Sequence, residues 1–227
     1  MANFTADTIE KIQTLLKHHD QEVVEQGLML LDARADFESD MRTTLGYQEG
    51  IKSAGLLREA SKESGFRDIV FLKAIALLLE FKVGWVLAIH KLSLNRSDLK
   101  TLDSLPALPQ LQELDLSGSR SLDNVGGLSS CLQLQELDLG RCKSLENVDG
   151  LANCTEIEEP VLSECESLEN VDGLSNCAGL ETLHLDWQRV NVGWNSRSVV
   201  PPEGLDGLAC KVNVSRSNPP FKVYRKD

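Results

Sequence analysis

Aromatic residues are scarce in this sequence, and leucine is abundant. Only 5% of the 227 residues are Phe, Trp or Tyr, whereas 38 residues are Leu. A core built from so many leucines and so few rings indicates a leucine-paved repeat or a helical bundle. The length allows one elongated domain or two small ones, and it suffices for a core without disulfide or metal staples.

Long hydrophobic runs are also missing. The most apolar stretch, residues 69–89, contains Lys73, Glu80 and Lys82, and a charged residue at the centre of a membrane span costs about 2.5–3.5 kcal/mol. The first residues, MANFTADTIEKIQ, lack the basic and then apolar regions of a secretory signal. We therefore expect no membrane association and a cytoplasmic location.

Positive charge is scarce in one part of the chain. The formal net charge is −12, and residues 101–186 carry 17 acidic but only 3 basic residues. Residues 187–227 carry 3 acidic and 7 basic residues. Without a basic stripe that could release phosphate counterions, nucleic acid is not expected as a partner. A basic protein is the partner that an acidic segment favours.

The usual catalytic and metal-binding motifs do not occur. The sequence has no G-x-S-x-G, no phosphate-binding glycine loop and no H-E-x-x-H. Its six cysteines include no C-x-x-C pair, and no D-x-D-x-D-G calcium loop is present. We therefore predict that the protein is not an enzyme, with no cofactor, no catalytic residue and no metal site.

The sequence does contain an internal repeat. Three near-copies of 23 residues start at Leu111, Leu134 and Ile157, a 22-residue copy starts at Ile89, and a last copy starts at Leu180 and then loses the pattern. Their shared frame is L-x-x-L-x-L-x-x-[C/S]-x-x-L followed by N-V-x-G-L-x-x-C. This frame resembles the leucine-rich repeat family over about residues 89–188. The resemblance implies an α/β solenoid of about five repeats, with short parallel β-strands on its concave face.

The residues inside each repeat support the same geometry. Apolar and polar residues alternate in E-L-D-L, as a half-buried strand requires, so Leu114 and Leu116 are expected to point inward. The resemblance places Cys142 and Cys165 where the family often has Asn or Cys, which implies a small polar side chain that bonds to turn backbone, and we expect a buried ladder of thiols there. Three asparagines precede V-x-G-L and are expected to fix the convex turn: Asn124, Asn147 and Asn170.

Pro160 breaks the pattern because it replaces a strand leucine in IEEPVL. Proline has no N–H for the ladder, so we expect either a bulge or a lost bond between neighbouring strands. The expected cost relative to leucine is about 1–3 kcal/mol.

Helices are expected before the repeats and an irregular cap after them. We predict an α-helical N-terminal cap region over 1–84, the solenoid over 85–190 and a C-terminal cap with one or two edge strands over 191–227. The predicted helix signals are a cap at Thr5 or Thr8, a second cap at Asp20, helices over 37–45, 51–62 and 66–81, and an end at Gly84. The edge strands are expected at the end of GLDGLACKVNVS and at 221–224.

Outward side chains of stacked strands form columns across the repeats, with neighbours about 4.8 Å apart. Carboxylates at that spacing repel by about 1 kcal/mol in water, so their retention favours a docking face for a basic partner. Trp187, at one end, is the expected aromatic anchor. The predicted partner-binding residues are Glu113, Asp115, Glu136, Asp138, Arg141, Glu159, Glu164, His184, Asp186 and Trp187. A solvated acidic face that only aids solubility and a cation site remain alternatives.

We therefore predict a protein–protein interaction module that binds a basic protein through an acidic concave surface. The family contains the ribonuclease inhibitors, acidic horseshoes that neutralise basic nucleases, so an inhibitor or immunity-type protein is one form of this hypothesis. The alternative is an adaptor or regulatory subunit that works through its N-terminal helices, with the solenoid as scaffold. A purely structural repeat would bind no partner saturably. The sequence leaves the oligomeric state open.

Overall fold

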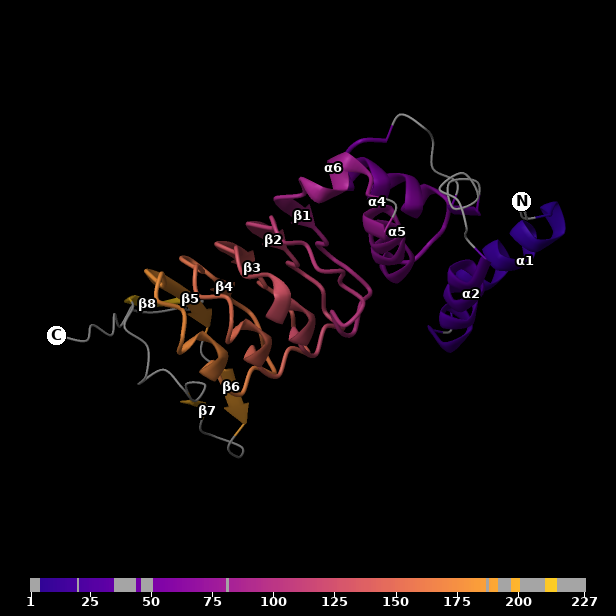
Figure 1. The fold of residues 1–227 in the computed structure, drawn as a ribbon. Helices are drawn as coiled ribbons and strands as arrows, with labels where there is room; N and C mark the ends of the chain where they lie inside the picture. The colour runs from indigo at the N-terminus through magenta and orange to yellow at the C-terminus, as the bar shows by residue number, and fades with distance from the viewer. Residues whose placement is uncertain are drawn as a thin grey trace. The chain divides into compact units, whose positions relative to one another are not determined.

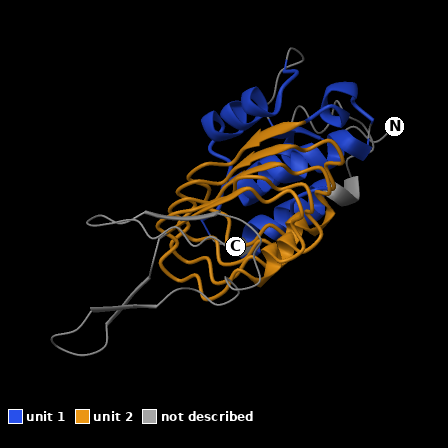
Figure 2. Cartoon of the chain, turned by 90° about the vertical axis from the view of Figure 1, so that its left-hand side faces the viewer, with its two compact units in different colours: residues 1–89, 104–106 blue, residues 90–103, 107–227 orange. Residues whose placement is uncertain are grey.

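The chain divides into two compact units (Figure 2). The structure is a computed structural model, and it describes residues 5–19, 21–34, 44–45, 51–80, 82–186, 188–191, 197–200 and 211–215. One unit comprises Met1–Ile89 with Ser104–Pro106, and the other comprises His90–Asp103 with Ala107–Asp227. The first unit is helical and the second contains the repeats.

Two helices of the first unit begin at side-chain caps. Its helices in the described residues are α1 (Ala6–Leu16), α2 (Gln21–Arg34), α4 (Ala54–Glu63), α5 (Asp68–Glu80) and α6 (Gly84–Leu87), shown in Figure 1. Thr5, one of the two predicted candidates, caps α1 by accepting a hydrogen bond from the Thr8 N–H at 3.3 Å. Ser53 caps α4 in the same way through the Leu56 N–H. Each cap satisfies a backbone N–H that has no partner within the helix.

Helix α5 forms the core of this unit. Most of its side chains between Ile69 and Leu78 are buried, as expected for a helix that is apolar on most sides. Its buried carboxylate, Asp68, accepts hydrogen bonds from Arg58 Nε at 2.7 Å and from Arg58 Nη2 at 2.8 Å. The two side chains are only 4% and 8% exposed. A buried ion pair therefore joins α4 to α5, and removing either side chain would take away the opposite charge that offsets the cost of burying the other.

The structure corrects the predicted end of the last helix. Helix α5 ends at Glu80, and Gly84 begins the short helix α6 instead of terminating a longer one. Lys82, between the two helices, has a left-handed conformation with φ of 53°. The predicted cap Asp20 and most of the predicted helix over 37–45 lie outside the described residues. No helix in the described part of the chain is long and apolar enough to cross a membrane.

The second unit contains a ladder of short parallel strands, one from each of the five repeats and a sixth from the C-terminal region. These strands are β1 (Lys91–Ser93), β2 (Glu113–Asp115), β3 (Glu136–Asp138), β4 (Val161–Leu162), β5 (Thr182–Asp186) and β8 (Lys211–Ser215). They form one sheet in the order β1-β2-β3-β4-β5-β8, visible as successive arrows in Figure 1. In-register pairing places Leu114 beside Leu92 on one side and beside Leu137 on the other. The predicted solenoid of parallel strands is therefore confirmed.

Leucines and tight turns fill and close each repeat. Leu94, Leu116 and Leu139 are fully buried beneath the strands. Short 3-10 helices follow on the return segments, η1 (Gly126–Ser130), η2 (Asp149–Leu151) and η3 (Asp172–Leu174). Before each one, an asparagine side chain accepts a hydrogen bond at 3.2 Å from the backbone N–H two residues later; these are Asn124, Asn147 and Asn170. The predicted role of the asparagines in the turn is confirmed.

The return segments pack so closely that they require glycine. A Cβ on Gly150 would lie 2.1 Å from the carbonyl oxygen of Val125 in the preceding repeat. No real side chain could occupy that position without moving backbone. The glycine of N-V-x-G-L therefore sets the approach of one repeat to the next.

The predicted ladder of small polar side chains is present inside the solenoid. Ser119 Oγ, Cys142 Sγ and Cys165 Sγ donate to the carbonyl oxygens of Leu94, Leu116 and Leu139 at 3.2, 3.3 and 3.1 Å, respectively. All five cysteines in the described residues are free and buried. Burial raises the pKa of Cys142 and of Cys154 from 9.0 to about 12. These thiols are therefore protonated at neutral pH and act as structural donors, not as nucleophiles.

Pro160 shortens the ladder at one strand. Strand β4 spans two residues, and its pairing with β3 is limited to Asp138 beside Val161. The Pro160 carbonyl accepts a hydrogen bond from the His184 N–H at 3.2 Å, but its ring nitrogen has no hydrogen to donate. Because the N–H and C=O of one strand residue face the same neighbouring strand, the donor that Pro160 lacks would have faced β5, and this is the lost ladder bond of the two predicted outcomes.

The predicted strand near the C-terminus extends the same sheet. Strand β8 pairs in parallel with β5 over five residues, and its two valines lie beside the inward leucines of β5. An antiparallel hairpin, β6 (Gln188–Asn191) and β7 (Arg197–Val200), comes between them in the chain and was not predicted. The strand predicted over 221–224 lies outside the described residues.

Candidate functional site

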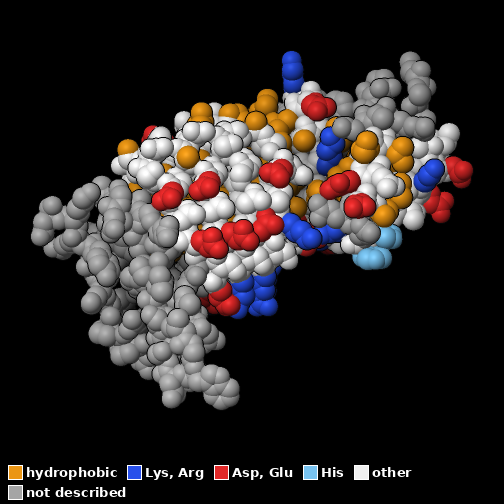
Figure 3. Space-filling view, turned by 90° about the horizontal axis from the view of Figure 1, so that it is seen from below, with side chains coloured by type: hydrophobic (Ala, Val, Ile, Leu, Met, Phe, Trp, Pro, Cys, Tyr) orange, Lys and Arg blue, Asp and Glu red, His pale blue; other side chains and the backbone are white. Residues whose placement is uncertain are grey.

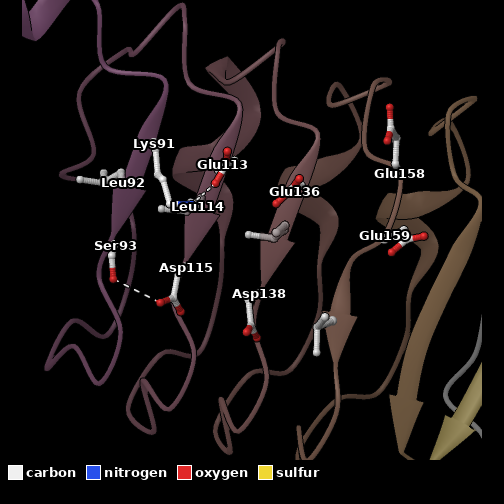
Figure 4. A pocket seen from close by; sticks show the side chains of 12 residues that line it. Lys91, Leu92, Ser93, Glu113, Leu114, Asp115, Glu136, Asp138, Glu158 and Glu159 are labelled. Atoms are coloured by element: carbon white, nitrogen blue, oxygen red, sulfur yellow. Dashed lines mark hydrogen bonds and ion pairs between the residues drawn. The ribbon is translucent and has the colours of Figure 1, made fainter.

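The strands of the repeat unit carry an open acidic groove. Glu113 and Asp115 of β2 lie in register with Glu136 and Asp138 of β3, and these side chains project from the same surface (Figure 4). The groove has a volume of about 530 Å³. Because the inward positions between these acids are leucines, the outward positions of two strands bring four carboxylates together. We call this surface the acidic groove; its lining residues are Lys91, Leu92, Ser93, Glu113, Leu114, Asp115, Glu136, Leu137, Asp138, Glu158, Glu159 and Val161.

Hydrogen bonds orient the two aspartates of the groove. Asp115 Oδ1 accepts from the Ser117 N–H at 2.9 Å and from Ser117 Oγ at 2.6 Å, and its Oδ2 accepts from Ser93 Oγ at 3.2 Å. Asp138 Oδ1 accepts from the Gly140 N–H at 2.8 Å. Both aspartates therefore cap the turn that leaves their strand, and they contribute fixed negative charge to the groove.

One lysine closes the groove at β1. The Lys91 ammonium pairs with the Glu113 carboxylate of the next strand. This hydrogen bond is the main reason why the pKa of Lys91 lies above its ordinary value, with smaller contributions from the charges of Glu136 and Asp115. The groove therefore already binds one cationic side chain, which belongs to the protein itself.

The fourth repeat completes the acidic lining. Glu159 lies just before Pro160 and, as predicted from its column, lines the groove with Glu136. Glu158 lines it too and was not predicted, although it occupies the repeat position of Gln135 (Figure 4). Glu158, like Gln135 in the preceding repeat, lies before its strand, where inward–outward alternation makes no prediction.

Arg141 and Glu164 lie outside the lining of the groove. Both occupy the turn that leaves their strand and both have positive φ, 65° and 59°. Their side chains form a salt bridge at 3.1 Å and are 66% and 49% exposed. Arg141 and Glu164 therefore pair with each other on the strand-exit turns. They were predicted to share a surface with the carboxylates on the strands, but they do not line the groove.

The predicted residues of the fifth repeat are only partly described. His184 lies on β5 in register with Val161 and is half-buried. Asp186 is the last residue of β5, and its side chain lies outside what the structure describes. Trp187, the predicted aromatic anchor, is also outside the described residues.

Acidic side chains form rows along the repeat unit (Figure 3). One set in register is Asp123, Glu146 and Glu169, whose backbone N–H groups each bond to the preceding repeat, at 2.9, 3.0 and 2.8 Å. These three residues do not line the groove, so the acidity of residues 101–186 is not confined to it. In the described part of the chain, no group of three or more His, Cys, Asp or Glu residues is arranged to hold a metal ion.

The solved structures that are similar to this chain include two internalins. An internalin C2 (inlC2) from Listeria monocytogenes is 17% identical with a TM-score of 0.38, and the match covers 78% of this chain and 72% of that one. An internalin (inlF) from the same species is 14% identical with a TM-score of 0.41, covering 93% of this chain and 70% of that one. No protein-family model and no curated protein matches the sequence. Likeness at these values transfers no role to this chain.

Proposed function

The chain is a leucine-rich repeat protein, and on that premise we propose that it is a non-enzymatic protein-interaction module whose acidic groove binds a basic protein. The observation that carries the proposal is the in-register stacking of Glu113 with Glu136 and of Asp115 with Asp138 on one open surface. An inhibitor or immunity-type protein that covers a basic partner is the concrete form of this function.

The electrostatics of the groove support a cationic partner. Carboxylates stacked at about 4.8 Å repel each other by about 1 kcal/mol in water, and by more where a partner excludes solvent. A partner that brings Lys or Arg side chains removes this repulsion and gains attraction. Charge of one sign in a hollow also speeds encounter with a partner of the opposite sign.

The pairing of Lys91 with Glu113 indicates how a partner would bind. Both side chains are at the surface, and exposed ion pairs are weak and easily exchanged. A partner lysine or arginine can occupy the same position over β2 and β3. Arginine suits the site because its planar fork binds a carboxylate through two hydrogen bonds.

The test compares two triple variants with the same change of charge. The groove variant carries Glu113→Lys, Glu136→Lys and Glu159→Lys, and the control carries Asp123→Lys, Glu146→Lys and Glu169→Lys. Each variant changes one residue in each of the same three repeats, so only the surface differs. Each serves as bait in a lysate of the source cell, captured proteins are identified by mass spectrometry, and the affinity for each candidate is then measured against salt.

We expect a basic protein that wild type and control retain and the groove variant loses, with binding weakened by salt. Equal retention by the groove variant would move the site elsewhere and refute the proposal. The rival role, an adaptor working through its helices, predicts that charge changes in the groove are neutral and that removing the helical unit abolishes capture. Loss of binding with both triple variants would indicate a general charge effect and would also contradict a groove site.

A further inference from the structure

The carboxylates of the acidic groove differ in how far the protein itself uses them. They form two rows that cross the strands, one of glutamates and one of aspartates (Figure 4). Asp115 and Asp138 accept hydrogen bonds from the turns that follow their strands, at 2.6 to 2.9 Å. In the described residues, no backbone N–H bonds to a glutamate side chain of the other row. The aspartates therefore stabilise the repeats, and the glutamates are the acids that a partner can engage.

The row of glutamates begins at a cation of the protein. Lys91 lies in register with Glu113, and its ammonium pairs with that carboxylate. In the described part of the chain, no cationic side chain forms a salt bridge with Glu136 or Glu159, and both side chains are exposed. The uncompensated charge of the row therefore lies on β3 and just before β4, and the β1–β2 end of the row is neutralised.

The row of glutamates ends after Glu159. The 23-residue register of the sheet places Thr182 of β5 next to it, and threonine carries no charge. Two neighbouring glutamates without a cation, Glu136 and Glu159, therefore remain between the paired Glu113 and Thr182. Adjacent strands are about 4.8 Å apart, and an extended peptide presents residues i and i+2 on one face about 6.6 Å apart. Long arginine side chains can bridge this small difference.

We propose that the acidic groove recognises a partner segment that presents two cationic side chains on one face, as in an extended Arg-x-Arg sequence, with one bound at Glu136 and the other at Glu159. This inference rests on the proposed function, because it specifies which feature of a basic protein the groove binds. Arginine suits both positions, since its planar fork binds a carboxylate through two hydrogen bonds. Lys91 limits the site to two cations, because it already occupies Glu113, where a third cation would bind.

The experiment titrates short peptides into the full chain labelled with ¹⁵N and measures their affinity by NMR, which is suited to weak binding. One peptide contains Arg-Ser-Arg and a longer one contains Arg-Ser-Arg-Ser-Arg, each acetylated and amidated to remove the terminal charges. A copy of the first peptide with citrulline in place of arginine keeps the shape without the charge. Sodium chloride is held at about 20 mM, because salt weakens exposed ion pairs.

Two pairs of variants match the change of charge and differ in its place. Glu136→Gln/Glu159→Gln is compared with Glu146→Gln/Glu169→Gln, which changes the same two repeats at positions that do not line the groove. Lys91→Gln is compared with Lys100→Gln, which lies in the same repeat and also outside the lining. Circular dichroism and thermal unfolding check that each variant is folded.

We expect wild type to bind the Arg-Ser-Arg peptide saturably and not to bind the citrulline copy. Glu136→Gln/Glu159→Gln should lower the affinity about tenfold, because two charge-assisted contacts are lost, whereas its control should change it by less than about twofold. No saturable binding, or equal binding of the citrulline copy, would overturn this inference and leave the proposed function to the capture experiment. An equal loss in the control would place the site outside the groove and overturn both.

The third arginine tests whether Lys91 limits the site. In wild type and in Lys100→Gln it should raise the affinity by less than about twofold, because no further glutamate of the row lacks a cation. In Lys91→Gln it should raise the affinity about fivefold, because Glu113 is then available. A third arginine that helps wild type as much as Lys91→Gln would show that cations bind along the whole groove. That result would refute the two-cation site and leave the proposed function standing.

Discussion

At the scale of single residues, the buried thiols hydrogen-bond one repeat to the next. Cys142 donates to the Leu116 carbonyl at 3.3 Å, and Ser119 does the same one repeat earlier. Serine and cysteine are therefore interchangeable donors at this position. They differ in what alkali does to them, because only the thiol ionises in the accessible pH range.

The raised pKa of Cys142 predicts a loss of stability in alkali. Its pKa rises from 9.0 to about 12 on burial, so its contribution is fully present below pH 9 and decreases as the pH approaches 12. The unfolded thiol ionises first, which favours unfolding by about 2 kcal/mol at about pH 10.5. The free energy of unfolding in urea, measured at about pH 8 and about pH 10.5, should fall less in Cys142→Ser than in wild type. An equal fall in both proteins would contradict the burial of this thiol.

At the scale of secondary-structure elements, Pro160 interrupts an otherwise regular ladder. Strands β2 and β3 pair over three residues, whereas β3 and β4 pair over one. The proline itself is buried, so the position has the environment of a core leucine but lacks a leucine's N–H and volume.

Replacing Pro160 with leucine should stabilise the repeat unit. Leucine restores the ladder donor and fills the core position, which together are worth about 1–3 kcal/mol. The change is measured as a shift in the urea midpoint of unfolding at constant slope. A Pro160→Leu variant that is no more stable than wild type would show that the shortened strand carries no cost.

The ion pair between α4 and α5 has a different energetic character. Asp68→Ala should destabilise the helical unit by about 3–5 kcal/mol, because it leaves the Arg58 charge buried without its carboxylate. The double variant Arg58→Met/Asp68→Leu should lose much less, since apolar residues of similar volume replace both charges. Thermal unfolding of the two variants distinguishes these cases. Equal losses would mean that the pair itself, and not the burial of an Arg58 charge that has lost its carboxylate, determines stability.

At the scale of the whole molecule, charge is concentrated in one part of the chain. Residues 101–186 carry 17 acidic and 3 basic residues, and the repeat stacks many of these acids in register. Folding therefore brings together like charges that the unfolded chain keeps farther apart. The fold tolerates this repulsion because the leucine core of every repeat opposes it.

Salt should stabilise the protein by screening this repulsion. Raising sodium chloride from about 10 mM to about 300 mM is expected to increase the free energy of unfolding by about 1 kcal/mol. Glu136→Gln should reduce the increase, because it removes one stacked carboxylate. Urea unfolding at the two salt concentrations provides the measurement. A fall in stability with salt would indicate that attractive ion pairs, such as Lys143 with Glu166, outweigh the stacked acids.

The sequence by itself determined the repeat, its register and the inside of the solenoid. Strand residues alternate between two faces, and equivalent residues of successive repeats stack beside one another. The 23-residue period therefore predicts where each leucine, cysteine and asparagine lies in the solenoid. Glu113, Asp115, Glu136 and Asp138 were predicted to share a surface for the same reason, and the structure places them together. That they bind a partner remains a prediction.

Only the tertiary structure decided what happens where the regular strand ends. The left-handed turns direct Arg141 and Glu164 out of the groove, and hydrogen bonds between repeats stabilise these turns. Strand β4 starts only after Pro160, and Glu158, which precedes the strand, lines the groove. The sequence repeat predicts the position of a side chain only where every repeat has the same backbone conformation. At turns, insertions and prolines the conformation depends on contacts with neighbouring repeats, which alternation along the chain does not encode.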